Sequence, residues 1–126
     1  MKLVIDMPWE RSLSVNHMRF GRGGHYRKKP EVQAWMSRLE GELYVECSLD
    51  NLVHGIRLSS AGEVRVTVDF RWPTAHRRDT HNYFKVICDA VASGLGIDDK
   101  DIRPSVGTVG VDRDNPGFTI TVEDER

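Results

Sequence analysis

The densest polar chemistry of the chain lies in the segment RRDTHNYFKVICDA at residues 77–90, with GLGIDDKDI following at 94–102. Its polar side chains are Arg77, Arg78, Asp79, His81, Asn82, Lys85 and Asp89. A hard divalent cation needs carboxylate oxygens that converge from separate segments, and Mg²⁺ usually keeps waters and substrate phosphate oxygens in its shell. The segment therefore indicates either a metal-dependent active site or a charged helix end.

Each polar residue also has a purely structural interpretation. Asp79 precedes the expected helix and can cap its first turn, and Lys85 and Asp89 have the spacing of an ordinary i,i+4 ion pair. Asp98 and Asp99 can start a turn or short helix in DDKDI. The coincidence of these roles at one strand-to-helix junction and the loop after its helix favours a site. Asp79 and Asp99 can share it only if the chain returns from the far end of the helix.

The helix that carries this cluster is expected over residues 80–93, with glycines at 94 and 96 to end it. Its spacing puts Asn82, Lys85 and Asp89 along one face. A neighbouring apolar stripe can pack on a sheet, and it consists of Tyr83, Ile87, Ala90 and Val91.

The remaining elements follow from periodicity and turn residues. We expect a strand at 2–7, a long loop at 8–29, a helix that starts at Pro30, a connection at 48–61 and a strand at 63–72. A final hairpin is expected from 103–111, the turn DRDNPG at 112–117, and the strand FTITV. The order predicts one α/β (α+β) domain over 1–126, with a mixed sheet of about four strands and two main helices.

Composition leaves the function open but limits the class. The net charge of −1 does not indicate a nucleic-acid binder, yet residues 1–30 carry seven basic side chains against two acidic ones. Such an arm can follow phosphates, and a solvated loop is an equally good interpretation. Cys47 and Cys88 lie in apolar helical patterns and are predicted to be reduced and buried. No signal peptide or membrane span is evident, which predicts a cytoplasmic protein.

The cluster resembles the signature of the RusA-type Holliday junction resolvases. That signature is an arginine-rich lead into Asp-x-Asp-Asn, a lysine on the next helix, an aspartate four residues later and a double aspartate after the helix. Here it reads RRDTHN, Lys85, Asp89, then GIDD and Ile102. The stretch PWERSLSVNH matches the family's N-terminal loop more weakly. The resemblance covers most of the chain and implies a RusA-like fold.

The resemblance implies roles for individual residues. Asp79 and Asp99 match metal-binding carboxylates, Lys85 matches a catalytic lysine and Asp89 a supporting acid, with Asn82 and Asp98 beside them. His81 stands where the family has a second metal-binding aspartate. The cofactor that the resemblance implies is Mg²⁺ or Mn²⁺. An imidazole at position 81 contributes no charge and suits Mn²⁺ or Zn²⁺ better than Mg²⁺, so His81 leaves the identity of the metal open.

The implied activity is that of a metal-dependent endodeoxyribonuclease that resolves four-way DNA junctions by paired phosphodiester hydrolysis. Family members act as homodimers and would fit phage recombination. The expected DNA contacts are Asn16, Arg19, Arg22, Arg27, Lys28, Lys29, Arg77 and Arg78. A branched-DNA binding protein that does not cleave is the alternative, because of His81. A third interpretation is a small structural domain whose cluster is a capped, charged helix.

Overall fold

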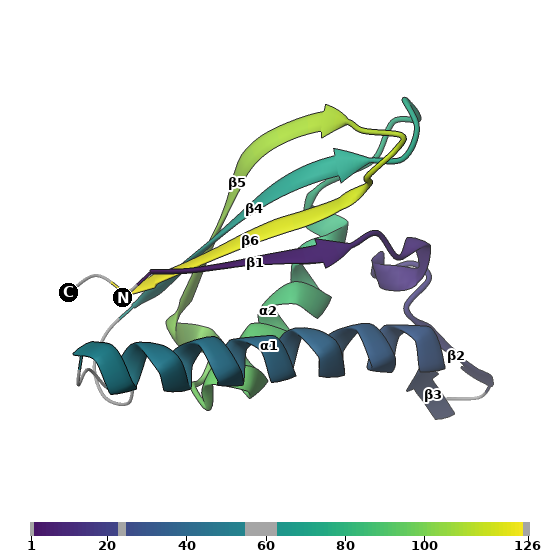
Figure 1. Ribbon diagram of the computed structural model, residues 1–126. Coiled ribbons are helices and arrows are strands. Elements are labelled where there is room, and N and C mark those ends of the chain that lie inside the picture. The colour runs from purple at the N-terminus through teal and green to yellow at the C-terminus, as the bar shows by residue number, and fades with distance from the viewer. Residues whose placement is uncertain (1, 23–24, 55–62, 125–126) are drawn as a thin grey trace.

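A computed structural model of the chain describes residues 2–22, 25–54 and 63–124. Along the chain the elements are β1 (Lys2–Pro8), the 3₁₀ turn η1 (Arg11–Leu13), β2 (Arg19–Arg22), β3 (His25–Lys28), α1 (Pro30–His54), β4 (Val64–Trp72), α2 (His81–Leu95), the 3₁₀ turn η2 (Asp99–Asp101), β5 (Ile102–Val111) and β6 (Gly117–Asp124) (Figure 1).

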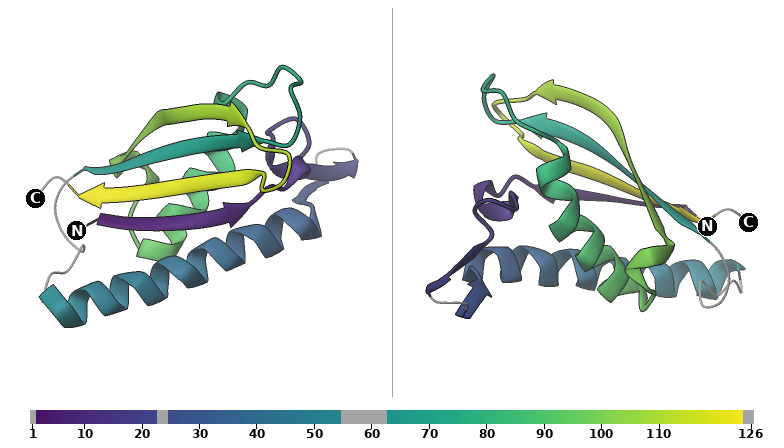
Figure 2. Two further views of the ribbon diagram at one scale, coloured as in Figure 1. Left: turned by 45° about the horizontal axis from the view of Figure 1, so that its top comes forward. Right: turned by 180° about the vertical axis from the view of Figure 1, so that it is seen from behind.

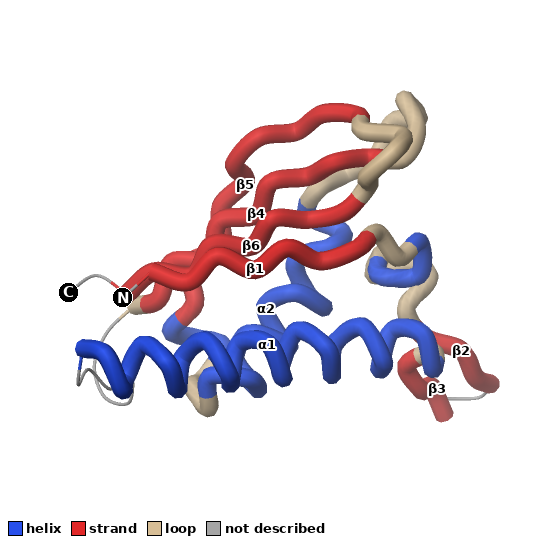
Figure 3. Tube along the Cα trace, viewed as in Figure 1, coloured by secondary structure: helices blue, strands red, loops and turns tan. Residues whose placement is uncertain are grey.

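The main sheet has four strands in the order β1-β6-β4-β5. β5 runs parallel to β4, and the other neighbours are antiparallel. Both helices lie on one face of this sheet, and its other face is bare (Figure 2). The predicted mixed four-stranded sheet with two main helices is therefore confirmed, as the separation of helix and strand segments in Figure 3 also shows.

The predicted hairpin of the last two strands is wrong in its pairing, although both strands exist. β4 lies between β5 and β6, and the turn after β5 crosses the end of β4, where Asp112 N donates to the Trp72 carbonyl at 2.9 Å. The reason is burial. Phe118, Ile120 and Val122 are fully buried, so β6 takes a central position in which both of its edges are paired.

Two further expectations need correction. Residues 48–54, expected in a connection, continue α1, and the rest of that connection lies largely outside the described residues. Apolar side chains at exposed positions, Tyr44, Val45 and Leu49, obscure the helical period there. The expected long loop at 8–29 contains η1 and the hairpin β2–β3. This hairpin stands apart from the main sheet, so no apolar alternation marks it.

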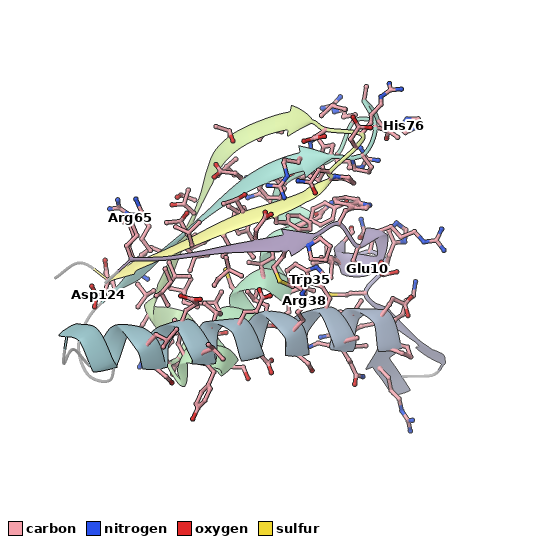
Figure 4. All side chains as sticks on the ribbon, viewed as in Figure 1. Glu10, Trp35, Arg38, Arg65, His76 and Asp124 are labelled. Carbon is pink, nitrogen blue, oxygen red and sulfur yellow. The ribbon has the colours of Figure 1, made fainter. Side chains whose placement is uncertain are left out.

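The core fills the space between the helices and the sheet, and it ends in a cluster of aromatic rings. Trp9, Phe70, Trp72, Tyr83 and Phe118 have neighbouring ring centroids 5.0–6.3 Å apart. Trp35 of α1, labelled in Figure 4, donates from its indole nitrogen to the Pro8 carbonyl at 2.8 Å. These contacts fix the end of the sheet at which β1 leaves and α2 begins.

The two helices pack closely because α2 carries a glycine at their contact. A Cβ at Gly94 would lie 3.0 Å from the Glu40 Cα and 3.3 Å from the Leu43 Cβ. Cys47 and Cys88 form no disulfide, as predicted, but each is half-buried rather than fully buried, since both lie at the margin of the core. None of the described helices is long and apolar enough to cross a membrane.

Candidate active site on helix α2

The N-terminus of α2 is capped by Asp79. Its Oδ1 accepts the backbone N–H of His81 at 3.0 Å, whereas the Thr80 side chain makes no cap hydrogen bond. The capping interpretation of Asp79 is thus confirmed. Asp79 is nevertheless exposed, so a carboxylate that caps the helix can still meet a ligand.

The expected division of α2 into a polar and an apolar face is confirmed. Tyr83, Ile87, Ala90 and Val91 are buried, while Lys85 Nζ lies 3.3 Å from Asp89 Oδ2 on the polar side. His81 is exposed one turn before Lys85, and residues at i and i+4 are neighbours on a helix surface. A line of polar side chains therefore runs down one side of α2.

The chain after α2 turns back along that polar side. Gly96 adopts φ 68°, in the left-handed region that favours glycine, and ends the helix as predicted. Asp98 then caps η2 by accepting from Lys100 N at 3.1 Å. As a result, Asp99 shares a pocket of about 230 Å³ with Lys85 and Asp89. Cys88, Ile102 and Pro104 form its remaining wall.

Two pKa shifts describe the surroundings of this small pocket. Burial raises the pKa of the Cys88 thiol to about 11, and the carboxylates of Asp89 and Asp99 add to the rise. The Lys100 N–H and a hydrogen bond with Asp99 lower the pKa of Asp98. The pocket thus combines two carboxylates with one ammonium group in reach of solvent.

A larger pocket of about 610 Å³ opens at the N-terminal end of α2. Five residues predicted to contact DNA or metal line it together with Asn82, and they are Asn16, Lys29, Arg77, Arg78 and Asp79. The loop before β2 reaches this pocket because Val15 N donates to the Asn82 carbonyl at 2.9 Å. Asn16 and Asp79 therefore line the same pocket, although the two are far apart in sequence.

Arg78 is held by the protein itself. Its guanidinium donates to the Thr74 carbonyl at 3.0 Å, to the Thr74 hydroxyl at 2.8 Å and to the His76 carbonyl at 3.2 Å. It also lies over the rings of Trp9 and Trp72, 5.4 and 5.5 Å from their centroids. Arg78 thus fixes the loop before α2 and forms a rigid wall of the larger pocket.

The other predicted DNA contacts lie on the hairpin beside this pocket. Arg19 and Lys28 face each other across β2–β3, and Arg27 is exposed. The side chain of Arg22 lies outside the described part of the structure. Figure 1 shows the hairpin at the same end of the molecule as the loop before α2, so the basic residues gather around one end.

Asp79 and Asp99 line different pockets. Among the described residues, no three His, Cys, Asp or Glu side chains form a ligand group for a metal ion. The return of the chain after α2 therefore brings Asp99 to Lys85 and Asp89, whereas Asp79 lines the larger pocket.

Sequence reasoning missed several residues of the larger pocket. Trp9, Arg11, Ser14 and Tyr83 line it, and Tyr83 was assigned to the apolar stripe alone. Burial raises the pKa of Tyr83, and the nearby Arg78 partly offsets the rise. Only the position of Trp9, directly after the proline that stops β1, gave a sign that the loop begins with a large packing residue.

Comparison with known families decides the class of protein. Residues 23–123 match the sequence model of the family described as Endodeoxyribonuclease RusA. The chain belongs to the RusA endodeoxyribonuclease family. The match includes α2, η2 and the hairpin strand β3, so the resemblance that the RRDTHN signature predicted is confirmed. A search among curated proteins finds no match.

Proposed function

We propose that this protein is a metal-dependent, structure-selective endodeoxyribonuclease that resolves four-way DNA junctions by paired phosphodiester hydrolysis. The observation that carries the proposal is the small pocket of Lys85, Asp89 and Asp99. These residues come from two separate segments, they occupy the positions of the RusA signature, and they meet in space. A capped helix end alone would not require Asp99 to return to Lys85.

The donor atoms of the small pocket fit a hard cation. Asp89 and Asp99 supply carboxylate oxygens, and Mg²⁺ typically binds one or two carboxylates and completes its shell with waters and phosphate oxygens. Mn²⁺ accepts the same ligands and tolerates imidazole, so it is also compatible with Asp79 and His81, the further ligands that the resemblance implies. When bound, such an ion would polarise the scissile phosphate and lower the pKa of an attacking water.

The chain's own side chains would prepare the phosphate for attack. The Lys85 ammonium, 3.3 Å from Asp89 and half exposed, can move to a phosphate oxygen and neutralise the charge that develops there. Asp89 holds Lys85 in place until the substrate arrives. The basic residues of the β2–β3 hairpin would hold the flanking phosphates at a distance from the carboxylates.

Paired cleavage requires two sites, and we infer a homodimer. One chain carries one set of these residues, so two nicks in opposed strands need a second copy. The outermost strand β5 offers a surface for that copy, with Val106, Val109 and Val111 exposed by 39%, 51% and 47%. A monomer in light scattering would argue against this assembly.

Branched DNA also implies action in the cytoplasm of a bacterial or phage-infected cell.

The second candidate is a protein that binds branched DNA without cleaving it. Its support is that Asp79 already has a structural role as a cap, and that His81 replaces an acidic ligand. This protein would bind four-way junctions with or without divalent metal and would never nick them.

A cleavage assay distinguishes the two candidates. The protein is incubated with a labelled four-way junction in Mg²⁺, Mn²⁺ or EDTA, beside the variants Asp99→Asn and Asp101→Asn. Asp101 lies in the same 3₁₀ turn but does not line the small pocket, so it controls for loss of charge. We expect symmetrical, metal-dependent nicks that vanish in Asp99→Asn and persist in Asp101→Asn. Tight binding without nicks would establish the second candidate.

A further inference from the structure

The larger pocket contains polar side chains that the protein leaves without hydrogen-bond partners. Within the described residues, no group pairs with the side-chain amides of Asn16 and Asn82, the indole N–H of Trp9 or the hydroxyl of Tyr83. All four residues line this pocket. Two donor-acceptor amides, an N–H and a hydroxyl around one cavity are suited to a ligand with mixed hydrogen-bonding edges.

The bare face of the sheet shows a contrasting arrangement, because its polar groups pair with each other. Arg71 binds Asp6 at 2.7 Å and Thr119 at 2.6 Å. Likewise Thr67 and Ser105 are 3.1 Å apart. These side chains of the sheet are satisfied within the protein, whereas the amides, the indole N–H and the hydroxyl that line the larger pocket remain available to a ligand.

The charges that line the larger pocket argue against a site that binds only the phosphate backbone of DNA. Four cationic side chains line it, but so do the carboxylates of Glu31 and Asp79. A carboxylate repels phosphate, whereas it accepts hydrogen bonds from the exocyclic amino groups of cytosine, adenine and guanine. A nucleotide meets both demands, since its base offers such donors and its phosphate suits the cations.

Trp9 and Arg78 form a wall of the pocket that the protein holds rigidly. Trp9 stacks on Phe118 with centroids 5.5 Å apart, and the Arg78 guanidinium lies over Trp9, fixed by hydrogen bonds to its own loop. Unstacked bases bind to aromatic rings and to guanidinium planes. The volume of about 610 Å³ falls in the range of small-ligand sites.

We propose that this pocket receives one unpaired nucleotide from the branch point of the DNA. Its base lies against the wall of Arg78 and Trp9, the amides of Asn16 and Asn82 read its edge, and its phosphate points to Arg77 and Lys29. A base at a branch point is unpaired at lower cost than a base within a duplex, so the pocket would favour branched over linear DNA. This inference rests on the proposed function.

The test uses junctions that carry 2-aminopurine beside the branch point and fluorescein on a distant arm, in EDTA so that no metal-dependent cleavage occurs. Anisotropy reports binding, and 2-aminopurine emission reports loss of stacking. Because an aromatic or guanidinium wall can quench emission, the readout is any change specific to one position next to the branch point. We expect this change with the wild type and not with 2-aminopurine inside a continuous duplex.

Two variants make the test specific. Asn16→Ala removes an exposed amide without an intramolecular partner, and we expect it to abolish most of the emission change and to weaken junction binding about 2- to 10-fold. Asn115→Ala removes an exposed amide in the turn after β5, outside the pocket, where only the backbone of Asn115 is hydrogen-bonded, and it should behave as wild type. Equal urea midpoints establish that both variants are folded.

The outcomes separate this inference from the proposed function. Junction binding without an emission change at any branch-point position, or an Asn16→Ala variant identical to wild type, would overturn the nucleotide pocket and leave cleavage intact. Absence of junction binding by anisotropy would overturn both.

Discussion

The two roles of Asp79 can be separated by a pair of substitutions. Its carboxylate accepts the His81 N–H at 3.0 Å, and the resemblance to the RusA signature implies that it also binds metal. Asp79→Asn keeps an oxygen that can accept this hydrogen bond but removes the charge. Asp79→Ala removes both. Stability should therefore follow the hydrogen bond, and cleavage should follow the charge.

The expected magnitudes follow from the geometry of the cap. Loss of the cap in Asp79→Ala should lower the free energy of unfolding by about 1 kcal/mol, which for a domain of this size lowers Tm by about 3–5 °C. Asp79→Asn should cost at most about 0.5 kcal/mol, since asparagine caps as well as aspartate and loses only the interaction with the helix dipole. Both variants should lose more than about 100-fold in metal-dependent cleavage.

Urea unfolding and cleavage of a labelled junction measure the two effects on the same preparations. Thr80→Ala is the matched control, because the Thr80 side chain makes no cap hydrogen bond, and it should change neither quantity. Asp79→Asn that cleaves at the wild-type rate would reduce Asp79 to a helix cap. An Asp79→Ala variant with an unchanged urea midpoint would show that the observed hydrogen bond does not stabilise α2.

Three further predictions test the surroundings of the site. A Cβ at Gly107 would overlap the Asp69 carboxylate. That carboxylate anchors β5 by accepting the backbone N–H of Thr108 at 2.7 Å. Gly107→Ala should therefore lower the free energy of unfolding, measured in urea, by about 2–3 kcal/mol. The rate of Cys88 alkylation, followed by peptide mass spectrometry, should still increase above pH 10, because the thiol has a pKa of about 11. Asp99→Asn should increase this rate at pH 8, because the loss of a neighbouring negative charge lowers the pKa of the thiol. His81→Asp should gain Mg²⁺-supported cleavage over wild type; an unchanged rate would mean that this side chain points away from the ion.

The pKa of Cys88 also predicts how stability depends on pH. Its value in the folded protein, about 11, exceeds the ordinary value of 9.0, so the folded state binds the thiol proton more tightly. This contribution is fully present below pH 9 and is lost as pH rises toward 11. A urea midpoint that falls across this range in wild type, and falls less in Cys88→Ala, would confirm the sign.

The local part of the site was accessible from sequence because it depends on residues close together in the chain. The helix spacing of Lys85 and Asp89, the cap by Asp79 and the left-handed Gly96 each follow from neighbours within one or two helical turns. The alternation of β4 was equally clear, since its residues face the core and solvent in turn. The RRDTHN signature was sufficient to indicate the family.

Tertiary structure decided which of these residues meet. β4 lies between β5 and β6 because β6 is buried between β1 and β4. The periodicity of the sequence does not indicate which strands become neighbours. The meeting of Asp99 with Lys85, and the contact of Val15 with Asn82 at the start of α2, depend on how the chain packs after each turn. Sequence by itself determined the chemistry available on α2 and the family that uses it. Packing divided that chemistry between two pockets, because contacts between distant segments are set by the core they share and not by their spacing along the chain.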